Sequence, residues 1–430
     1  MTAEVAIMNQ HALVFAADSA TTVTHWLKGQ PEIRYFKGAN KLFQLSEVHP
    51  VGLMIFGSAA LHSVPWEIIV KDFRAHLGRD SSDSIAGYRE RFFRFVEGHT
   101  ALFPDELKTK LFEDHATMAA FANARLIRDD DSVTQAEGED KVNRYRERFE
   151  RLVQDVAAVG VSRPLKPEDI EAAVAAHRAQ IERRIRDEIG TEYVLDMELA
   201  PRLADVSIRA VMKRHDLFLG DTGIVIGGYG DKDYFPSFEV YACRGFLDKH
   251  FIAVPKEEPE PTLAKITRDI PAVIRPFATT SMINTFRLGI SPDVHQSVYD
   301  ATQRCLTRFA GKVAAKIGHE GELPELKQLI EEALEEHSQE WFGLSFSDHY
   351  SPMARVIASL PVTEMAALAK SLIELQSLKE RVTQPSESVG GPIDVAVISR
   401  HDGFIWIERK HYFRPDLNPR FFTRRYSKTP

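Results

Sequence analysis

The sequence has few cysteines and no long apolar run. Its 430 residues include two cysteines, Cys243 and Cys305, which are too few and too far apart for a disulfide framework or a paired-cysteine metal site. No apolar segment approaches the ~20 residues needed to cross a bilayer. The start of the chain also lacks the basic and then apolar segments of a secretory signal. We therefore expect a cytoplasmic protein with reduced thiols and no membrane partner.

An excess of positive charge and the common cofactor motifs are absent as well. The formal net charge is -8, which argues against a general nucleic-acid binder. The chain has no GxGxxG or GxxxxGK[ST] phosphate loop and no HExxH motif. Histidines such as His49, His62 and His76 are scattered, so they do not predict a zinc site. We expect no cofactor and no metal.

Short apolar runs near the N-terminus predict paired strands. Residues 5–8 and 12–17 are apolar and are separated by three polar residues, which is typical of a hairpin of buried strands. Residues 41–45 and 51–56 predict a second pair. A segment with apolar residues at helical spacing follows Pro65. The first part of the chain is thus predicted to be strands followed by a helix.

The remaining chain alternates between helical and strand patterns. Residues 80–215 are rich in charge, with apolar residues recurring every three or four positions, which predicts amphipathic helices. Strands are predicted again at residues 223–228 and 238–242, and helices from residue 279 onward. A final hairpin is predicted at residues 393–408, where Asp-Gly forms the turn. This order predicts an α+β layered fold with a helical insertion.

The predicted domain organisation follows from these changes in pattern. It comprises a first core part at 1–79, a helical insertion at 80–215, a second core part at 216–316, a second helical insertion at 317–358, a last core part at 359–408, and a basic aromatic tail at 409–430.

Several strand segments also match a known pattern in the same order along the chain. They are Thr2-Ala-Glu-Val-Ala-Ile7, Ala16-Ala-Asp18, Lys41-Leu-Phe-Gln-Leu45, Gly52-Leu-Met-Ile-Phe-Gly57 and Gly390-Gly-Pro-Ile-Asp-Val-Ala-Val-Ile-Ser-Arg-His-Asp-Gly403. In this the chain resembles the proteasome β-subunit family of N-terminal-nucleophile hydrolases and its bacterial ATP-dependent peptidase relatives, as an enlarged member. The resemblance covers residues 2–78, 222–310 and 360–408. It implies a four-layer αββα sandwich.

The resemblance also implies a catalytic threonine. A threonine hydroxyl is a poor nucleophile until a base takes its proton. A threonine at the start of a chain carries its own base, the α-amine, whose unperturbed pKa is about 8. Thr2 would be this nucleophile after removal of Met1, and the small side chain of Thr2 suits ordinary methionine excision. Lys41 would lie beside the hydroxyl, and Asp18 would pair with Lys41 and orient it.

Further site residues are implied less directly. Gly57 would offer its backbone N–H to the oxyanion, a contribution of about 3 kcal/mol, although a plain turn glycine is the alternative. Thr280 and Ser388 would orient the amine, where the family also has an aspartate that this sequence lacks. Four residues fall where the family lines its primary specificity pocket: Thr21, Thr22, Ile55 and Ala59. Core packing accounts equally well for Ile55 and Ala59.

The sequence therefore predicts a threonine-type peptidase that acts through an acyl-enzyme on peptide or protein substrates. The resemblance implies a homo-oligomer, such as a ring, with an ATP-dependent unfoldase as a candidate partner. Two alternatives stay open: a small-molecule amidohydrolase on the same fold, and a catalytically silent oligomeric scaffold or binding protein. The missing aspartate favours the silent alternative.

Overall fold

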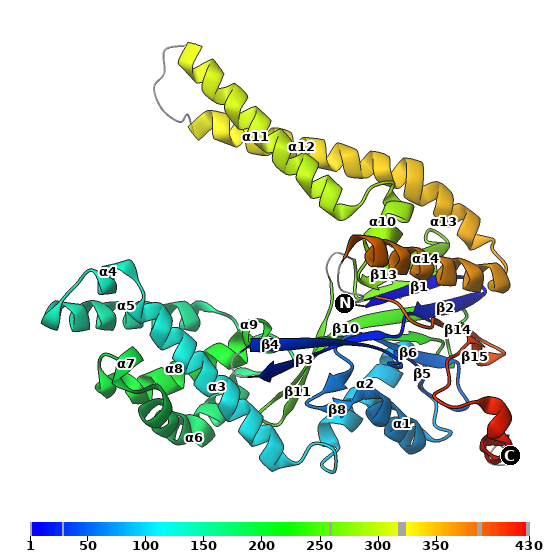
Figure 1. The fold of residues 1–430 in the computed structure, drawn as a ribbon, viewed down its shortest axis with the longest axis horizontal. Helices are drawn as coiled ribbons and strands as arrows, with labels where there is room; N and C mark the ends of the chain where they lie inside the picture. The colour runs from blue at the N-terminus through cyan, green and yellow to red at the C-terminus, as the bar shows by residue number, and fades with distance from the viewer. Residues whose placement is uncertain (1, 28–29, 258–259, 317–323, 385–388, 427–430) are drawn as a thin grey trace.

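The protein combines antiparallel sheets with many helices (Figure 1). The computed structural model describes residues 2–27, 30–257, 260–316, 324–384 and 389–426. Within these ranges no helix is both long and apolar enough to span a bilayer. The mixed α and β architecture with antiparallel sheets agrees with the prediction from the sequence.

The first sheet is built from the two ends of the chain. Its order is β13 (Ala272–Ala278), β1 (Ala3–Asn9), β2 (Ala12–Ala17), β14 (Asp394–Ser399) and β15 (Gly403–Glu408). The predicted N-terminal hairpin is confirmed, because β1 and β2 are antiparallel with Val5 opposite Ala16. The predicted C-terminal hairpin is also confirmed as β14 and β15. Strand β13, the neighbour of β1 on its other side, was not predicted.

The second sheet carries the middle strands. Its order is β11 (His250–Pro255), β10 (Ser237–Leu247), β9 (Thr222–Gly228), β6 (Val51–Gly57) and β5 (Leu42–Gln44), and β12 (Leu263–Lys265) pairs with β10. The predicted pair at 41–45 and 51–56 is confirmed as β5 and β6, and the predicted strands at 223–228 and 238–242 as β9 and β10.

Both sheets contribute to one buried apolar cluster. Met8 and Phe15 of the first sheet pack with Met54, Val225 and Phe238 of the second. The opposite face of the first sheet packs against α14 (Val362–Thr383), and that of the second against α1 (Trp66–Leu77) and α2 (Ile85–Gly98). The apolar face of each helix therefore covers a strand surface that would otherwise meet water.

A separate hairpin follows the first sheet's β2. Strands β3 (Ala20–Leu27) and β4 (Gln30–Lys37) pair antiparallel as a sheet of their own, with Thr22 opposite Tyr35. This hairpin was not predicted, because residues 20–37 show no run of apolar residues and no regular alternation. Two further short strands, β7 (Ala60–Leu61) and β8 (Val64–Pro65), lead into α1.

Helices fill the charged segment, as its pattern predicts. Apart from α2 they contribute to one apolar core, which includes Phe112, Phe149 and Ile181 and also Leu247 and Ile252 of the second sheet. These helices lie to one side of the sheets (Figure 1). They are α3 (Asp105–Arg128), α4 (Asp131–Thr134), α5 (Gly138–Ala158), α6 (Pro167–Arg184), η1 (Ile185–Ile189), α7 (Gly190–Tyr193), η2 (Met197–Leu199), α8 (Ala200–Lys213) and α9 (His215–Phe218).

A long helical hairpin projects away from the first sheet (Figure 1). It consists of α11 (Pro292–Lys316) and α12 (Pro324–Ser345), and it is connected to the sheet through α10 (Ser281–Leu288), η3 (Phe346–Tyr350) and α13 (Ser351–Ala358). The predicted helices in this part of the chain are confirmed. The described part of the tail contains η4 (Pro415–Leu417) and α15 (Pro419–Tyr426).

A buried histidine joins the helical segment to the second sheet. His177 of α6 has its Nδ1 3.3 Å from Glu113 Oε1 of α3 and its Nε2 3.3 Å from Asp248 Oδ1, in the turn between β10 and β11. The hydrogen bond to Asp248 raises the pKa of His177 above its ordinary value, and burial opposes this rise. When protonated, the imidazole donates to two carboxylates from different parts of the fold.

This bridge predicts pH-dependent stability. Because the pKa of His177 is raised in the folded state, its contribution is complete below about pH 6.5 and is lost as the pH rises through the folded-state pKa. We expect the melting temperature of His177→Gln to fall less than that of the wild type between about pH 6 and about pH 9. Thermal melts at a series of pH values measure this. The exposed His401→Gln is the matched control, and equal pH dependence in both variants would contradict the prediction.

Candidate active site

Thr2, the first residue that the structure describes, lies inside the protein. Thr2 directly precedes β1 and is 4% exposed. Its carbonyl oxygen accepts a hydrogen bond from the backbone N–H of Thr279, at 2.9 Å. Strand β1 is buried along its whole length, between β2 and β13. Thr2 is therefore held at the end of a central strand, where its side chain has defined neighbours.

Those neighbours are charged. Lys41, immediately before β5, is 4% exposed, and its ammonium contacts the carboxylate of Asp18, which follows β2. Lys41 Nζ also lies 3.1 Å from Glu4 Oε1. The Thr2 hydroxyl donates to the other Glu4 oxygen, Oε2, at 3.2 Å. The structure thus brings three of the residues named from the sequence together, and it adds Glu4 to them.

Asp18 is the anchor of this cluster. Its carboxylate accepts backbone N–H groups of Ala3 at 3.1 Å, Gly390 at 2.7 Å and Ala20 at 3.4 Å, in addition to the Lys41 ammonium. A fully buried carboxylate is tolerated when several donors replace the lost water. Backbone N–H groups from the strand ends and from the loop before β14 therefore replace the water molecules that would hydrogen-bond Asp18 in solvent.

The Gly390-Gly391 pair makes that loop possible. Both residues have positive φ, 135° and 85°, a region that side chains rarely adopt. A Cβ atom on Gly391 would also lie 3.0 Å from the Cβ of Lys37. The pair of glycines lets the backbone turn tightly enough to aim the Gly390 N–H at Asp18.

We expect Asp18→Asn to destabilise the fold. An amide keeps the shape of the side chain but turns one acceptor into a donor, which then faces a backbone N–H or the Lys41 ammonium. Loss of a buried, charged hydrogen-bond acceptor costs about 3 kcal/mol. Urea unfolding measures the change in the free energy of unfolding. The exposed Asp216→Asn is the matched control, and an Asp18→Asn variant as stable as this control would rule out the anchoring role.

Glu4 is the residue that the sequence prediction missed. It is fully buried, and burial raises its pKa to about 7; Lys41 partly offsets this rise and Asp18 adds to it. The signal was present in the sequence, because Glu4 is a lone charge within an otherwise apolar strand. A charged side chain in a fully buried strand requires a partner, and Glu4 has Lys41 and Thr2.

Gly57 ends β6 near the same region. The Phe56 ring lies 5.1 Å from that of Phe277, which in turn is opposite Glu4 in the first sheet. This contact places the end of β6 beside the start of β1. Gly57 is exposed and has φ of 82°, which favours glycine there whatever else the residue does.

The residues assigned to the specificity pocket are spread over two strands and the loop between β6 and β7. Ile55 is 2% exposed and packs in the cluster beneath α1, so its burial supports the core-packing alternative for this residue. Ala59 is half-buried, and its carbonyl accepts the Trp66 N–H at 3.1 Å. Thr21 and Thr22 lie on β3, half-buried and exposed respectively.

Thr280 and Ser388 are the two residues assigned to orienting the α-amine of Thr2. The Thr280 hydroxyl accepts a hydrogen bond from Asn284 Nδ2, at 3.0 Å. It is thus engaged with its own helix, α10, while the preceding residue contacts the Thr2 carbonyl through its backbone. Ser388 lies outside the described residues.

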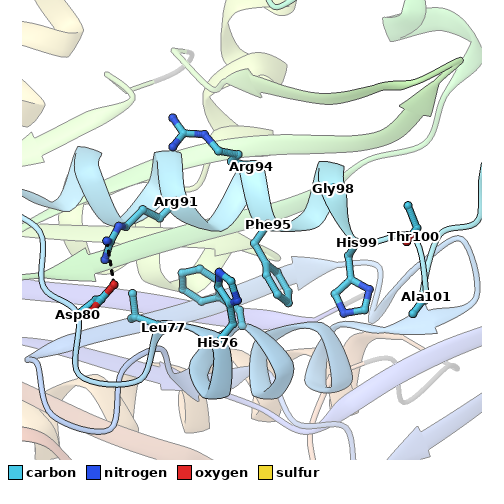
Figure 2. A pocket seen from close by; sticks show the side chains of 11 residues that line it. His76, Leu77, Asp80, Arg91, Arg94, Phe95, Gly98, His99, Thr100 and Ala101 are labelled. Carbon is cyan, nitrogen blue, oxygen red and sulfur yellow. Dashed lines mark hydrogen bonds and ion pairs between the residues drawn. The ribbon is translucent and has the colours of Figure 1, made fainter.

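A cavity elsewhere on the protein is separate from this cluster. It has a volume of 620 Å³ and lies between α1 and α2, where His76, Phe95 and His99 point into it and Arg91 pairs with Asp80 (Figure 2). Neither Thr2 nor its charged neighbours line this cavity. It therefore does not serve the Thr2 hydroxyl.

Comparison with known proteins does not identify a family for this chain. No family model and no curated protein matches the chain. Among the solved structures to which the chain is similar is one described as an Anbu (Gly-1) mutant from Hyphomicrobium sp. strain MC1, across 100% of this chain and 94% of that one. The identity is 11% and the TM-score is 0.26, which is too low to support any argument.

The family identification made from the sequence is therefore wrong as it stands. A member of the proteasome β-subunit family would match the family's model, and this chain does not. The matched segments are short, and most of their positions are small or apolar residues that buried antiparallel strands commonly share. The contacts around Thr2 do not depend on a family assignment, and they are the basis for a functional proposal.

Proposed function

We propose that the protein is a threonine-type amide hydrolase whose nucleophile is the Thr2 hydroxyl, freed for catalysis by removal of Met1. One observation carries the proposal: Thr2 is 4% exposed, and its hydroxyl donates to Glu4, which belongs to a buried group of one ammonium and two carboxylates. Burying such charges costs several kcal/mol per ion. Apolar side chains at this strand end would stabilise the sheet without that cost, so the buried charges favour a role in catalysis.

The residues suggest how the reaction proceeds. The Thr2 hydroxyl loses its proton to a base, for which the α-amine of Thr2 is one candidate, and attacks the amide carbonyl. The Lys41 ammonium stabilises the negative charge on the attacking oxygen, and Asp18 keeps Lys41 in place. The Gly57 N–H stabilises the oxyanion. The proton passes to the leaving amine, and water then releases the acyl group from Thr2.

The remaining roles complete the proposal. We assign Thr280 and Ser388 to orienting the amine, and Thr21, Thr22 and Ala59 to contacts with the acyl side of the substrate. The two sheets and their helices form a four-layer αββα sandwich, interrupted by helical insertions at 80–215 and 317–358. Peptide or protein substrates, a homo-oligomeric assembly and an ATP-dependent unfoldase are part of the same proposal.

A threonine-directed electrophile tests the proposed nucleophile. We expect a peptide epoxyketone to form a covalent adduct, and peptide mapping by mass spectrometry to locate it on Thr2 of chains that lack Met1. The reagent requires both an amine and a hydroxyl on one residue, so it distinguishes Thr2 from internal threonines. An unlabelled protein would support the silent scaffold, and an adduct on another residue would reject Thr2 as the nucleophile.

The tight burial favours a second candidate, a small-molecule amidohydrolase. Thr2 and Lys41 are each 4% exposed, which leaves little room for an extended peptide unless removal of Met1 opens the site. Hydrolysis of peptide amides can be compared with hydrolysis of small acyl amides of the same acyl group. Faster turnover of peptides would support the peptidase, and turnover confined to small amides would support this alternative.

A further inference from the structure

Glu4 makes a contact that an ion-pair partner of Lys41 would not need. One of its oxygens, Oε1, faces Lys41 Nζ at 3.1 Å, while the other, Oε2, accepts the Thr2 hydroxyl at 3.2 Å. The hydrogen bond is thus directed from the proposed nucleophile to a carboxylate. The proton that must leave Thr2 before attack therefore already points toward Glu4 in a hydrogen bond.

We infer that Glu4 is a catalytic residue that serves as the general base for Thr2. This inference rests on the proposed function. Glu4 Oε2 takes the proton of the Thr2 hydroxyl as Oγ1 bonds to the amide carbon, and the carbonyl oxygen becomes the oxyanion. Glu4 then gives that proton to the amide nitrogen as its bond to carbon breaks. In the second half, water loses a proton to Glu4, attacks the ester, and Thr2 Oγ1 takes the proton back.

The surroundings of Glu4 suit this role. It is fully buried, and its pKa is raised to about 7, mainly by burial. A base works best when its pKa lies near the working pH. The charged groups facing it are Lys41, before β5, and Asp18, after β2. Arg275 on β13 shares this face of the sheet, but its guanidinium bonds the carbonyl groups of Glu260 and Pro261.

The net charge of Glu4, Asp18 and Lys41 also links the ionisation of Glu4 to the removal of Met1. With both carboxylates ionised, one ammonium from Lys41 leaves an excess negative charge in a buried site, which is unfavourable. Removal of Met1 turns the neutral amide nitrogen of Thr2 into an ammonium, on the carbon next to the one that bears the hydroxyl. This added positive charge balances the group and lowers the pKa of Glu4. Exposure of the amine therefore helps to ionise the base.

A purely structural role for Glu4 makes a different prediction. If Glu4 only neutralised Lys41, its replacement would lower stability, and any change in reaction rate would be the same at every pH. A general base instead sets the pH dependence of the rate, because only its ionised form accepts the proton. The pH profile therefore separates the two roles.

The test is the rate at which a peptide epoxyketone labels Thr2, measured across pH in the full chain. For the wild type we expect two rises in the labelling rate: one below neutral pH, as Glu4 ionises beside the Thr2 ammonium, and one near about pH 8, as the α-amine that opens the epoxide loses its proton. For Glu4→Gln we expect a rate at least about 100-fold lower at neutral pH and loss of the lower rise only. Glu239→Gln, which alters a buried carboxylate of the second sheet, is the matched control and should keep the wild-type profile.

A second variant covers the case in which Glu4→Gln fails to fold. Glu4→Asp keeps the charge but withdraws the carboxylate by one methylene, so we expect slower labelling with the pH dependence retained. Wild-type rates and pH dependence in either folded variant would overturn the role of Glu4. A wild type that shows no labelling of Thr2 would instead overturn the proposed function itself, so the two failures are distinguishable.

Discussion

Thr2→Ala is expected to lower the rate of amide hydrolysis at least about 1,000-fold while the protein stays folded. The substitution removes the only hydroxyl that the proposal uses as nucleophile. It also removes one side-chain hydrogen bond, to Glu4, which contributes about 1 kcal/mol to stability. Steady-state hydrolysis and urea unfolding measure the two effects separately. The large effect on rate and the small effect on stability should therefore appear in the same sample.

Thr2→Ser is the matched control for this prediction. Serine keeps the hydroxyl and the α-amine and loses one methyl group, so we expect hydrolysis within about tenfold of the wild type. If Thr2→Ala and Thr2→Ser lose activity equally, the hydroxyl is not the feature that matters. If Thr2→Ala hydrolyses the substrate as fast as the wild type, Thr2 is not the nucleophile.

Lys41→Met is expected to impair both stability and activity. Methionine fills a similar volume but leaves Glu4 and Asp18 buried without their ammonium. Removing one partner of a buried ion pair typically costs 3–5 kcal/mol, so we expect a loss of about 4 kcal/mol in the free energy of unfolding. Without the ammonium, the attacking oxygen also loses electrostatic stabilisation, and we expect the rate of the folded fraction to fall at least about 100-fold.

Lys108→Met separates the two effects. Lys108 is another buried lysine, 5% exposed, whose ammonium donates to the carbonyl of Glu97 at 3.0 Å and lies far along the chain from the site. We expect this variant to lose stability but to keep the activity of its folded fraction. A Lys41→Met variant that behaves in the same way would show that Lys41 stabilises the fold without taking part in the reaction.

Much of the strand pairing could be predicted from the sequence, because buried central strands are continuous apolar runs. Strands β1, β2 and β14 are of this kind. Strand β15 is a less buried edge strand, and the Asp-Gly turn that precedes it made the hairpin predictable. Strand β13 escaped prediction because it contains Arg275 and Pro276. A proline removes a backbone donor and is tolerated at the edge of a sheet, and β13 is such an edge strand.

The candidate site could be predicted only in part. Thr2, Asp18 and Lys41 were named through a resemblance that the family comparison does not uphold, yet the structure brings them together. Glu4 was not named, although a lone acid in an apolar strand signals a buried partner. That partner comes from a segment far along the chain. Local periodicity carries no information on such a long-range contact, and only the packing of the two sheets reveals it.

The native start of the chain tests the central claim most directly. The proposed mechanism requires Thr2 to be the first residue and so to carry a free α-amine. Intact-mass measurement and N-terminal peptide mapping should be made on protein expressed with its own first codon and no added residues. We expect chains that begin at Thr2. If every chain keeps Met1, Thr2 has no free amine, and the proposed threonine mechanism is contradicted.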